Sequence, residues 1–351
     1  MSRRTLAQLS EPPPDPFHER RRPAFQAHLQ VLGGRFQFET DNSRLLRIVQ
    51  LAYGGLPPHK LAGAVPRFRV RLALASTKQS DEILSKDEPP RVSPLSGGGL
   101  LCGVMRTSNF VALRPEQRSA LLVVSQDMLR FSYHIRYEML EFAVYVLAAR
   151  VQALVPLHAA CVGRDGRGIL LLGPSGSGKS TLTLHCLLQG LEFLAEDSVL
   201  VRPQGLLATG VANFLHVRPD SLRFLANAGR GIVHQASVIR RRSGVEKFEI
   251  DLRRPQYRLA PAPLRIGAVI FVSARNAGKR QLLQPLRSAA AIAQLARGQR
   301  YAAHQPGWSA FVRDVSALPA FELHRGRHPL EGVEALRGLL LTLPPGVRDK
   351  G

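Results

Sequence analysis

The chain has 351 residues, of which 45% are hydrophobic, and a formal net charge of +22. This hydrophobic content excludes a largely disordered chain and is enough for one large domain or two modest ones. Three widely spaced cysteines exclude a disulfide framework and a cysteine metal cluster, and they favour a reducing, cytoplasmic location.

The positive charge raises the question of a nucleic-acid or membrane partner. The arginines, however, are dispersed along the chain, and only 6% of the residues are aromatic, which leaves few surfaces on which bases could stack. We therefore expect no nucleic-acid partner, while an acidic partner stays open. No segment approaches the roughly 20 apolar residues that span a bilayer, and the first 25 residues lack the apolar core of a signal peptide.

The N-terminal part of the sequence predicts an arm followed by a small folded region. Residues 1–25 are rich in Pro and Arg and predict a flexible arm, and residues 26–127 predict an α+β region. Within this region, residues 41–55 have apolar residues at helical spacing. We expect Asp41 or Ser43 to cap this helix and the two glycines at its end to terminate it.

Alternating apolar and polar residues predict strands around this helix, at 35–40, 67–75, 110–115 and 120–125. Residues 76–99 are rich in Pro, Ser and Gly and predict a loop. The region ends before a long apolar helix, predicted over residues 133–156.

The second half of the chain, residues 128–345, alternates strands and helices and predicts an α/β domain with a substantial sheet. A hairpin is expected over 158–172, followed by a helix that ends at Gly190. The later segments predict a buried strand at 191–195, a strand at 264–274, a helix at 285–298, a strand at 320–326 and a helix at 330–343.

The segment "GPSGSGKST" satisfies the Walker A pattern and stands between a predicted strand and a predicted helix. Glycines allow backbone N–H groups to surround phosphates at a helix N-terminus, the lysine contacts the outer phosphates, and the following serine ligates Mg²⁺. We therefore predict an ATP and Mg²⁺ site. Its nucleotide-binding residues are Gly173, Pro174, Ser175, Gly176, Ser177, Gly178, Lys179, Ser180 and Thr181.

Two further features are candidates for the same site. Glu196 and Asp197 follow the predicted strand 191–195, and carboxylates at this place in phosphate-loop proteins hold Mg²⁺ or orient a nucleophile. The alternative is a solvated pair at a strand end. His158 stands beside an apolar run, where a packed, hydrogen-bonded histidine is the competing interpretation.

Taken together, residues 158–201 resemble the catalytic domain of the HPr kinase/phosphorylase family and its kinase-only relatives. His158 lies 22 residues before Ser180 and Asp197 lies 17 after it, and both intervals match the family. A looser likeness extends over residues 130–345. The resemblance implies a P-loop kinase domain of the HPr kinase C-terminal type, preceded here by a small α+β region, and a homo-oligomer is compatible with it.

The resemblance also implies roles for single residues. Lys179 would hold the phosphates, Ser180 would ligate Mg²⁺, Asp197 would be the general base, and His158 would lie near the phosphates. Arg218 takes the place of an arginine in a family segment whose glutamate binds metal, and His216 stands where that glutamate would be. Glu196 could supply the missing metal ligand.

Two further departures from the family narrow the expected activity. The segment before the strand at 264–274 lacks the family's element for the reverse, phosphorolytic reaction. The sequence therefore predicts a kinase without efficient phosphorylase activity. The first 130 residues do not resemble the family's usual N-terminal domain, which argues against HPr as the acceptor and for another protein, a peptide or a small hydroxylated molecule.

Three functions remain open from the sequence. The first is a kinase that phosphorylates a Ser- or Thr-type hydroxyl, and the second is a nucleotide-binding switch or assembly module with little turnover. The third, suggested by charge alone, is an ATPase associated with nucleic acid. The identity of the acceptor is not readable from the sequence.

Overall fold

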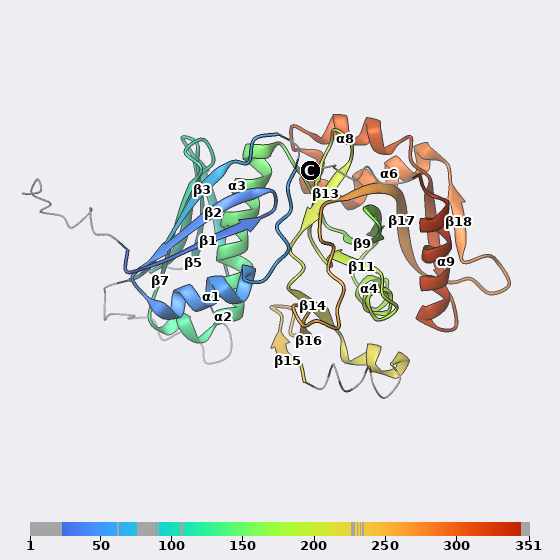
Figure 1. Cartoon of the computed structure of the whole chain (residues 1–351), viewed down its shortest axis with the longest axis horizontal. Helices are drawn as coiled ribbons and strands as arrows, with labels where there is room; N and C mark the ends of the chain where they lie inside the picture. Colours follow the sequence, from blue (N-terminus) through green and yellow to red (C-terminus); the bar gives the residue numbers. More distant parts are fainter. Residues whose placement is uncertain are drawn as a thin grey trace, which may run out of the picture.

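The structure, a computed structural model, describes residues 23–61, 63–75, 89, 91–105, 108–225, 229, 231, 233 and 235–344. The arm expected at residues 1–25 lies almost wholly outside the described residues. The described part of the chain forms a mixed α/β structure with two large sheets and a smaller third one (Figure 1). None of its helices has the length and apolarity needed to cross a membrane.

The first large sheet is built by the N-terminal part of the chain, in the strand order β1-β2-β3-β7-β6-β5-β4. The pairs β2–β3 and β3–β7 are parallel, and the remaining pairs are antiparallel. Its elements are β1 (Phe25–Val31), β2 (Gly34–Thr40), α1 (Ser43–Tyr53), β3 (Arg67–Leu74), β4 (Ser93–Gly97), β5 (Leu100–Met105), β6 (Asn109–Arg114) and β7 (Ser119–Val124).

The four strands and the helix predicted for this region are confirmed, but two details were wrong. The N-cap of α1 is Asn42, neither Asp41 nor Ser43, because the Asn42 side chain accepts hydrogen bonds from the backbone N–H groups of Arg44 and Leu45. Residues 93–97, expected to be part of a loop, form strand β4. The turn at Gly98 and Gly99, both with positive φ, folds this segment back against β5 despite its low strand propensity.

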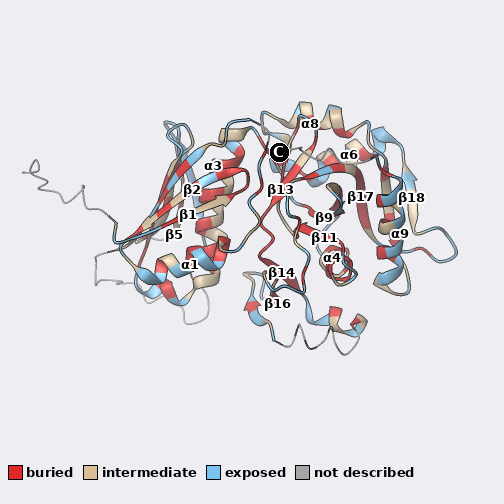
Figure 2. Ribbon diagram, in the orientation of Figure 1, coloured by how far each residue is buried: buried red, intermediate tan, exposed pale blue. Residues whose placement is uncertain are grey.

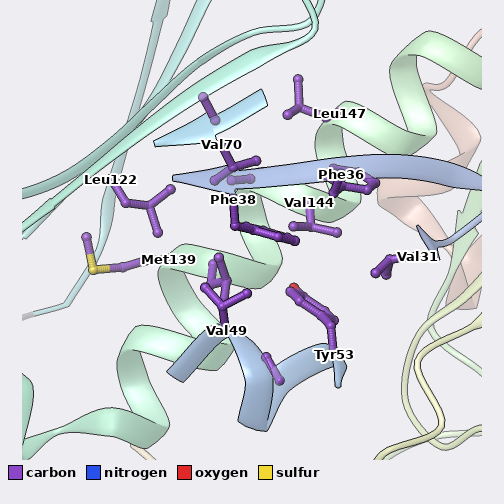
Figure 3. Close-up of a cluster of buried hydrophobic side chains, with 14 of the residues drawn as sticks. Val31, Phe36, Phe38, Val49, Tyr53, Val70, Leu122, Met139, Val144 and Leu147 are labelled. Carbon is purple, nitrogen blue, oxygen red and sulfur yellow. The ribbon is translucent and has the colours of Figure 1, made fainter. Parts of the chain in front are cut away.

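The long apolar helix predicted over 133–156 is present as α2 (Ser132–His134), the π-helical turn η2 (Ile135–Leu140) and α3 (Glu141–Gln152), after the short 3₁₀ turn η1 (Asp127–Arg130). It packs with α1 on one face of the first sheet. Figure 3 shows Val144, Leu147 and Met139 from this helix around Phe36 and Phe38 of β2. The apolar face of the helix therefore belongs to the core of the first sheet.

One acidic group inside this helix titrates far from its ordinary range. Glu141 is partly exposed as a residue, but burial of its carboxyl group raises the pKa to about 8. Between about pH 4.5 and 8, the unfolded chain therefore loses this proton while the folded protein keeps it. By linkage, this group makes the folded state less stable as the pH rises through that window.

We expect Glu141→Gln to increase the free energy of unfolding relative to the wild type by about 1–2 kcal/mol at pH 8, and by much less at pH 5. Urea denaturation at the two pH values measures the difference. Glu116→Gln, at an exposed position in the turn between β6 and β7, is the control and should give the same change at both pH values. A Glu141→Gln gain that does not depend on pH would contradict the prediction.

The second large sheet has the strand order β11-β9-β10-β17-β13-β12-β8, with β19 beside β17 and β18 beside β19. The central strands β10, β17 and β19 are parallel. Its strands are β8 (Val155–Leu157), β9 (Ala160–Arg164), β10 (Arg167–Leu172), β11 (Glu192–Ala195), β12 (Val199–Arg202), β13 (Leu207–Gly210), β17 (Leu264–Asn276), β18 (Leu283–Leu286) and β19 (Ala320–Arg325).

Helices cover both faces of this sheet. One face carries α4 (Lys179–Leu188) and α9 (Pro329–Thr342), and the other carries α6 (Ser288–Gly298), α7 (Arg300–Ala303) and α8 (Trp308–Val315). Figure 2 shows α4 as almost entirely buried, whereas α6 and α9 present exposed residues on their outer sides. The hairpin β9–β10 and the predicted α/β pattern are confirmed, but the helix predicted from residue 285 begins at Ser288, because residues 285 and 286 belong to β18.

The third sheet is small and has the strand order β14-β16-β15. It lies below the second sheet in Figure 1, next to α4. Its strands are β14 (Phe214–Val217), β15 (Ser237–Arg240) and β16 (Glu246–Asp251), and the 3₁₀ turn η3 (Pro219–Phe224) follows β14. The loop between β10 and α4, the end of β11 and this small sheet meet around one cavity.

Candidate active site

The glycine-rich loop connects the central strand β10 directly to the N-terminus of α4. Gly173, Gly176 and Gly178 have φ values of 146°, 80° and 107°, which side-chain-bearing residues adopt only under strain. A Cβ atom at Gly173 would lie 2.6 Å from the carbonyl oxygen of Val272. The loop therefore needs glycine for its backbone path and for the close approach of the neighbouring strand β17.

Two polar side chains of this segment differ in their hydrogen bonding: Lys179 has partners and Ser177 has none among the described residues. The Lys179 Nζ donates hydrogen bonds to the carbonyl oxygens of Gly173, at 2.5 Å, and Pro174, at 3.3 Å. Burial lowers the pKa of Lys179, and the charges of Asp197 and Glu196 oppose that effect. Among the described residues, the buried hydroxyl of Ser177 has no hydrogen-bond partner.

The two acidic residues after β11 lie in different environments. Glu196 is buried, and its Oε1 accepts a 2.6 Å hydrogen bond from the hydroxyl of Ser180. The Asp197 side chain is 46% exposed and lines the cavity. Only Asp197 is therefore accessible to a second substrate, while Glu196 lies beside the serine that was predicted to ligate a metal ion.

His158, which the resemblance to the HPr kinase family implied to be near the phosphates, lies against Asp197. Its Nδ1 is 3.2 Å from the Asp197 Oδ1 and 3.1 Å from the Asp197 carbonyl oxygen. Arg241 approaches from the opposite side, with its Nη2 3.4 Å from the Asp197 Oδ2. The two neighbours restrict the orientation of the carboxylate.

A residue that the sequence did not reveal fixes the backbone of His158. The buried side-chain amide of Gln299 donates to the His158 carbonyl oxygen at 3.0 Å and accepts from the His158 N–H at 2.7 Å. Gln299 stands at the junction of α6 and α7, 141 residues away in the sequence. No local pattern could have indicated this pairing.

A buried polar chain continues from Ser180 away from the cavity. The Oε2 of Glu196 accepts a hydrogen bond from the backbone N–H of His216 at 2.7 Å, and the His216 Nδ1 lies 3.2 Å from the same oxygen. The His216 Nε2 is 3.3 Å from Glu249, whose two oxygens accept hydrogen bonds from Arg136. This chain of hydrogen bonds thus reaches from Ser180, next to the glycine-rich loop, to the π-helical turn η2.

The charges of this chain depend on one another. Burial alone would raise the pKa of Glu196, but hydrogen bonds from His216 and Ser180 and nearby positive charge lower it to about 2. Burial would lower the pKa of His216, and its two carboxylate partners outweigh that effect and raise it. Both ring nitrogens of His216 face carboxylate oxygens, and this arrangement favours the protonated imidazole, a role that its replacement of a glutamate in the sequence did not indicate.

The cavity enclosed by these elements has a volume of about 870 Å³, in the range of small-molecule and cofactor sites. Seven Lys and Arg side chains line it, against two carboxylates, Asp197 and Asp220. Arg325, at the end of β19, donates to the Gly176 carbonyl oxygen at 2.8 Å. The cavity is therefore strongly cationic and suited to anionic ligands.

The residues present fit a nucleotide with Mg²⁺. The loop supplies backbone N–H groups at the N-terminus of α4, and the orphaned Ser177 hydroxyl and Lys179 ammonium add donors. In the described part of the chain, no three His, Cys, Asp or Glu side chains gather to hold a metal ion. A Mg²⁺ ion carried by a nucleotide takes one or two protein oxygens, and Ser180 and Glu196 offer such oxygens.

Most of the predicted site residues line the cavity, whereas Gly173 and the buried Glu196 lie behind its lining. Residues 174–181, Asp197 and His158 line the cavity together with Arg218. Arg218 is half exposed, and its one ion pair among the described residues is with Asp220 at 3.5 Å, so its side chain is not fixed in one orientation toward Asp197. Arg241, Lys247, Glu249 and Gln299 belong to the site and its support, and sequence reasoning missed them.

No protein-family model and no curated protein matches this sequence. Among solved structures, the chain is similar to the Hpr(Ser) kinase/phosphatase from Coxiella burnetii, over 53% of this chain and 90% of that one. The identity is 14% and the TM-score is 0.29, so the likeness is a distant one of fold only.

Proposed function

We propose that this protein is an ATP-dependent kinase that transfers the γ-phosphate to a Ser- or Thr-type hydroxyl. The observation that carries the proposal is the position of Asp197. This accessible carboxylate faces the same cavity as the glycine-rich loop and Lys179. A phosphate donor on the loop and an acceptor hydroxyl at Asp197 would therefore meet within one enclosed space.

In this proposal, the loop N–H groups and the N-terminus of α4 bind the phosphates, and Lys179 moves its ammonium from the Gly173 carbonyl oxygen to the outer phosphates. Ser180 and Glu196 are the protein oxygens available to Mg²⁺. When bound, Mg²⁺ neutralises charge on the phosphates and aligns them. The buried Arg136–Glu249–His216 chain keeps Glu196 in its position beside Ser180.

Asp197 then acts on the acceptor. Its carboxylate accepts the hydroxyl proton as the acceptor oxygen forms a bond to the γ-phosphorus. The bond between the γ-phosphorus and the bridging oxygen breaks, and its electron pair stays on ADP. His158, whose backbone is hydrogen-bonded to the side chain of Gln299, holds the carboxylate in the orientation that this step requires. The missing sequence element before β17 is the reason to propose a kinase without efficient phosphorylase activity.

The experiment that tests the proposal separates binding from transfer. Isothermal titration with Mg·ATP measures binding. Transfer is measured by incubating the protein and γ-labelled ATP with the macromolecular fraction of a cell lysate and, separately, with its small-molecule fraction. In Lys179→Met, the loss of charge-assisted hydrogen bonds should weaken Mg·ATP binding by about 10- to 100-fold. Wild-type protein that does not bind Mg·ATP, or a Lys179→Met variant with unchanged affinity, would refute the proposal.

One observation favours a second candidate function, a nucleotide-dependent switch with little turnover. The buried chain from Ser180 through Glu196, His216 and Glu249 to Arg136 is a physical connection between the phosphate loop and the N-terminal part of the protein. Mg·ATP binding without labelled product in any fraction, accompanied by changed protease sensitivity of the N-terminal part, would support the switch over the kinase.

A further inference from the structure

Three cations of the cavity come from the small third sheet rather than from the phosphate loop. Arg218 follows β14, Lys247 lies on β16, and Arg241 follows β15. The strand register places Val217 opposite Phe248 and Ile239 opposite Lys247, and the Arg241 N–H donates to the Val245 carbonyl oxygen. The three side chains therefore belong to the same end of one sheet and line the same cavity.

These cations lie on the Asp197 side of the cavity. Arg241 is ion-paired with Asp197, and Lys247 lies within electrostatic reach of the carboxylates of Glu196 and Asp197 and of the cations Arg241 and Arg218. The phosphate loop has its own cations, Lys179 within it and Arg325 on the Gly176 carbonyl oxygen. The nucleotide phosphates thus have cationic partners without the third sheet.

The carboxylates near these three cations are Asp197, Asp220 and the buried Glu196, which also accepts hydrogen bonds from Ser180 and His216. The Lys247 ammonium has no hydrogen-bond or ion-pair partner among the described residues, and burial lowers its pKa. Among the described residues, Arg218 forms an ion pair with Asp220 at 3.5 Å and Arg241 forms one with Asp197 at 3.4 Å, and the charge of Glu196 also acts on Arg241. Lys247, Arg241 and Arg218 also repel one another in a partly desolvated place, and an anion that joins them lowers this cost.

We infer that Arg218, Arg241 and Lys247 form a subsite for an anionic group of the acceptor. The molecule that is phosphorylated then carries a carboxylate or a phosphate close to its hydroxyl, and the subsite places that hydroxyl at Asp197. The inference rests on the proposed kinase function and names its acceptor class. Binding of the anion also relieves Asp197 of its pairing with Arg241, which frees the carboxylate to accept the proton.

The test measures the binding of inorganic phosphate to protein that is saturated with Mg²⁺ and the non-hydrolysable analogue AMP-PNP. Isothermal titration calorimetry at constant ionic strength gives the affinity. The wild type should bind phosphate, and Arg241→Gln/Lys247→Gln should bind it at least about tenfold more weakly. Its affinity for AMP-PNP should stay within about threefold. The control, Arg44→Gln/Arg47→Gln, removes the same charge from the exposed face of α1 and should leave phosphate affinity unchanged.

Two results would overturn the subsite. One is unchanged phosphate affinity in Arg241→Gln/Lys247→Gln. The other is a large loss of AMP-PNP affinity in that variant with phosphate binding intact, which would assign these cations to the γ-phosphate. Failure of the proposed function gives a different result. Protein that binds phosphate at the subsite but transfers no phosphate from Mg·ATP would support the anion subsite and contradict the kinase function. If AMP-PNP does not bind, the phosphate titration is run on Lys179→Met, in which the loop is disabled.

Competition against bound phosphate identifies the source of the anion. Glycerol 3-phosphate, which carries free hydroxyls beside a phosphate, stands for a small acceptor, and a short serine peptide flanked by aspartates stands for an acidic peptide. Whichever displaces phosphate at the lower concentration indicates the acceptor type. The same peptide with asparagines in place of the aspartates should not compete, and equal competition by this neutral peptide would contradict an anionic acceptor.

Discussion

Replacing Asp197 by Asn should lower the rate of phosphoryl transfer by about 10³-fold while Mg·ATP binds within about threefold of the wild-type affinity. The amide keeps the size of the side chain but cannot accept the hydroxyl proton. Removing the charge leaves the glycine-rich loop, Lys179 and Ser180 in place, so the donor half of the site persists. Single-turnover transfer and isothermal titration with Mg·ATP measure the two quantities separately.

The matched control for this variant is Asp220→Asn, the other carboxylate that lines the cavity. It removes the same charge from the same space, but its carboxylate pairs with Arg218 rather than with His158 and Arg241. Transfer by this variant should fall by less than about tenfold. Equal losses in the two variants would assign the effect to the net charge of the cavity, and an active Asp197→Asn variant would remove Asp197 from the role of base.

Local sequence patterns were sufficient to predict the strand, the glycine-rich loop and the helix of the proposed donor half of the site. The Walker A segment required a strand before it and a helix after it, and β10 and α4 stand there. The interval to Asp197 was informative because one helix and one buried strand have nearly fixed lengths. Elements whose signal lies within about 20 consecutive residues were therefore readable from the sequence.

The supporting residues depend on contacts between distant segments and gave no such signal. Gln299 reaches His158 across 141 residues, and Arg136 reaches Glu249 across 113. The cations Arg241 and Lys247 looked like the dispersed positive charge found along the whole chain. Only the register of β15 and β16 places them beside Asp197, and register is a tertiary property.

His216 shows the same limit from the other direction. By comparison with a family pattern, it was a missing metal ligand. In the structure, its imidazole ring lies between Glu196 and Glu249, and its hydrogen bonds help to lower the pKa of both carboxylates although they are buried. Whether a histidine coordinates a metal ion, exchanges a proton or links two carboxylates depends on its partners. Here the partners are Glu196, directly after β11, and Glu249 on β16.

The second large effect is expected on stability, at the far end of this buried chain. Arg136 donates two hydrogen bonds to Glu249, at 2.9 and 2.8 Å, and its guanidinium lies over the rings of Phe214 and Tyr137. Arg136→Met leaves two carboxylates with the single imidazolium of His216 in a buried site. We expect the free energy of unfolding to fall by about 3–5 kcal/mol, because an unpaired buried charge remains.

Urea denaturation at pH 7 measures this loss against two matched variants. Arg150→Met makes the same change on the exposed side of α3, where the arginine has no partner among the described residues, and should cost less than about 1 kcal/mol. Adding Glu249→Gln to Arg136→Met removes the unpaired charge and should restore part of the stability, so that the double-mutant cycle gives a coupling energy of at least about 1 kcal/mol. Additive effects, or an Arg136→Met variant as stable as Arg150→Met, would show that the chain does not stabilise the fold. Its role would then be confined to holding Glu196 beside Ser180, which Mg·ATP affinity in Arg136→Met measures directly.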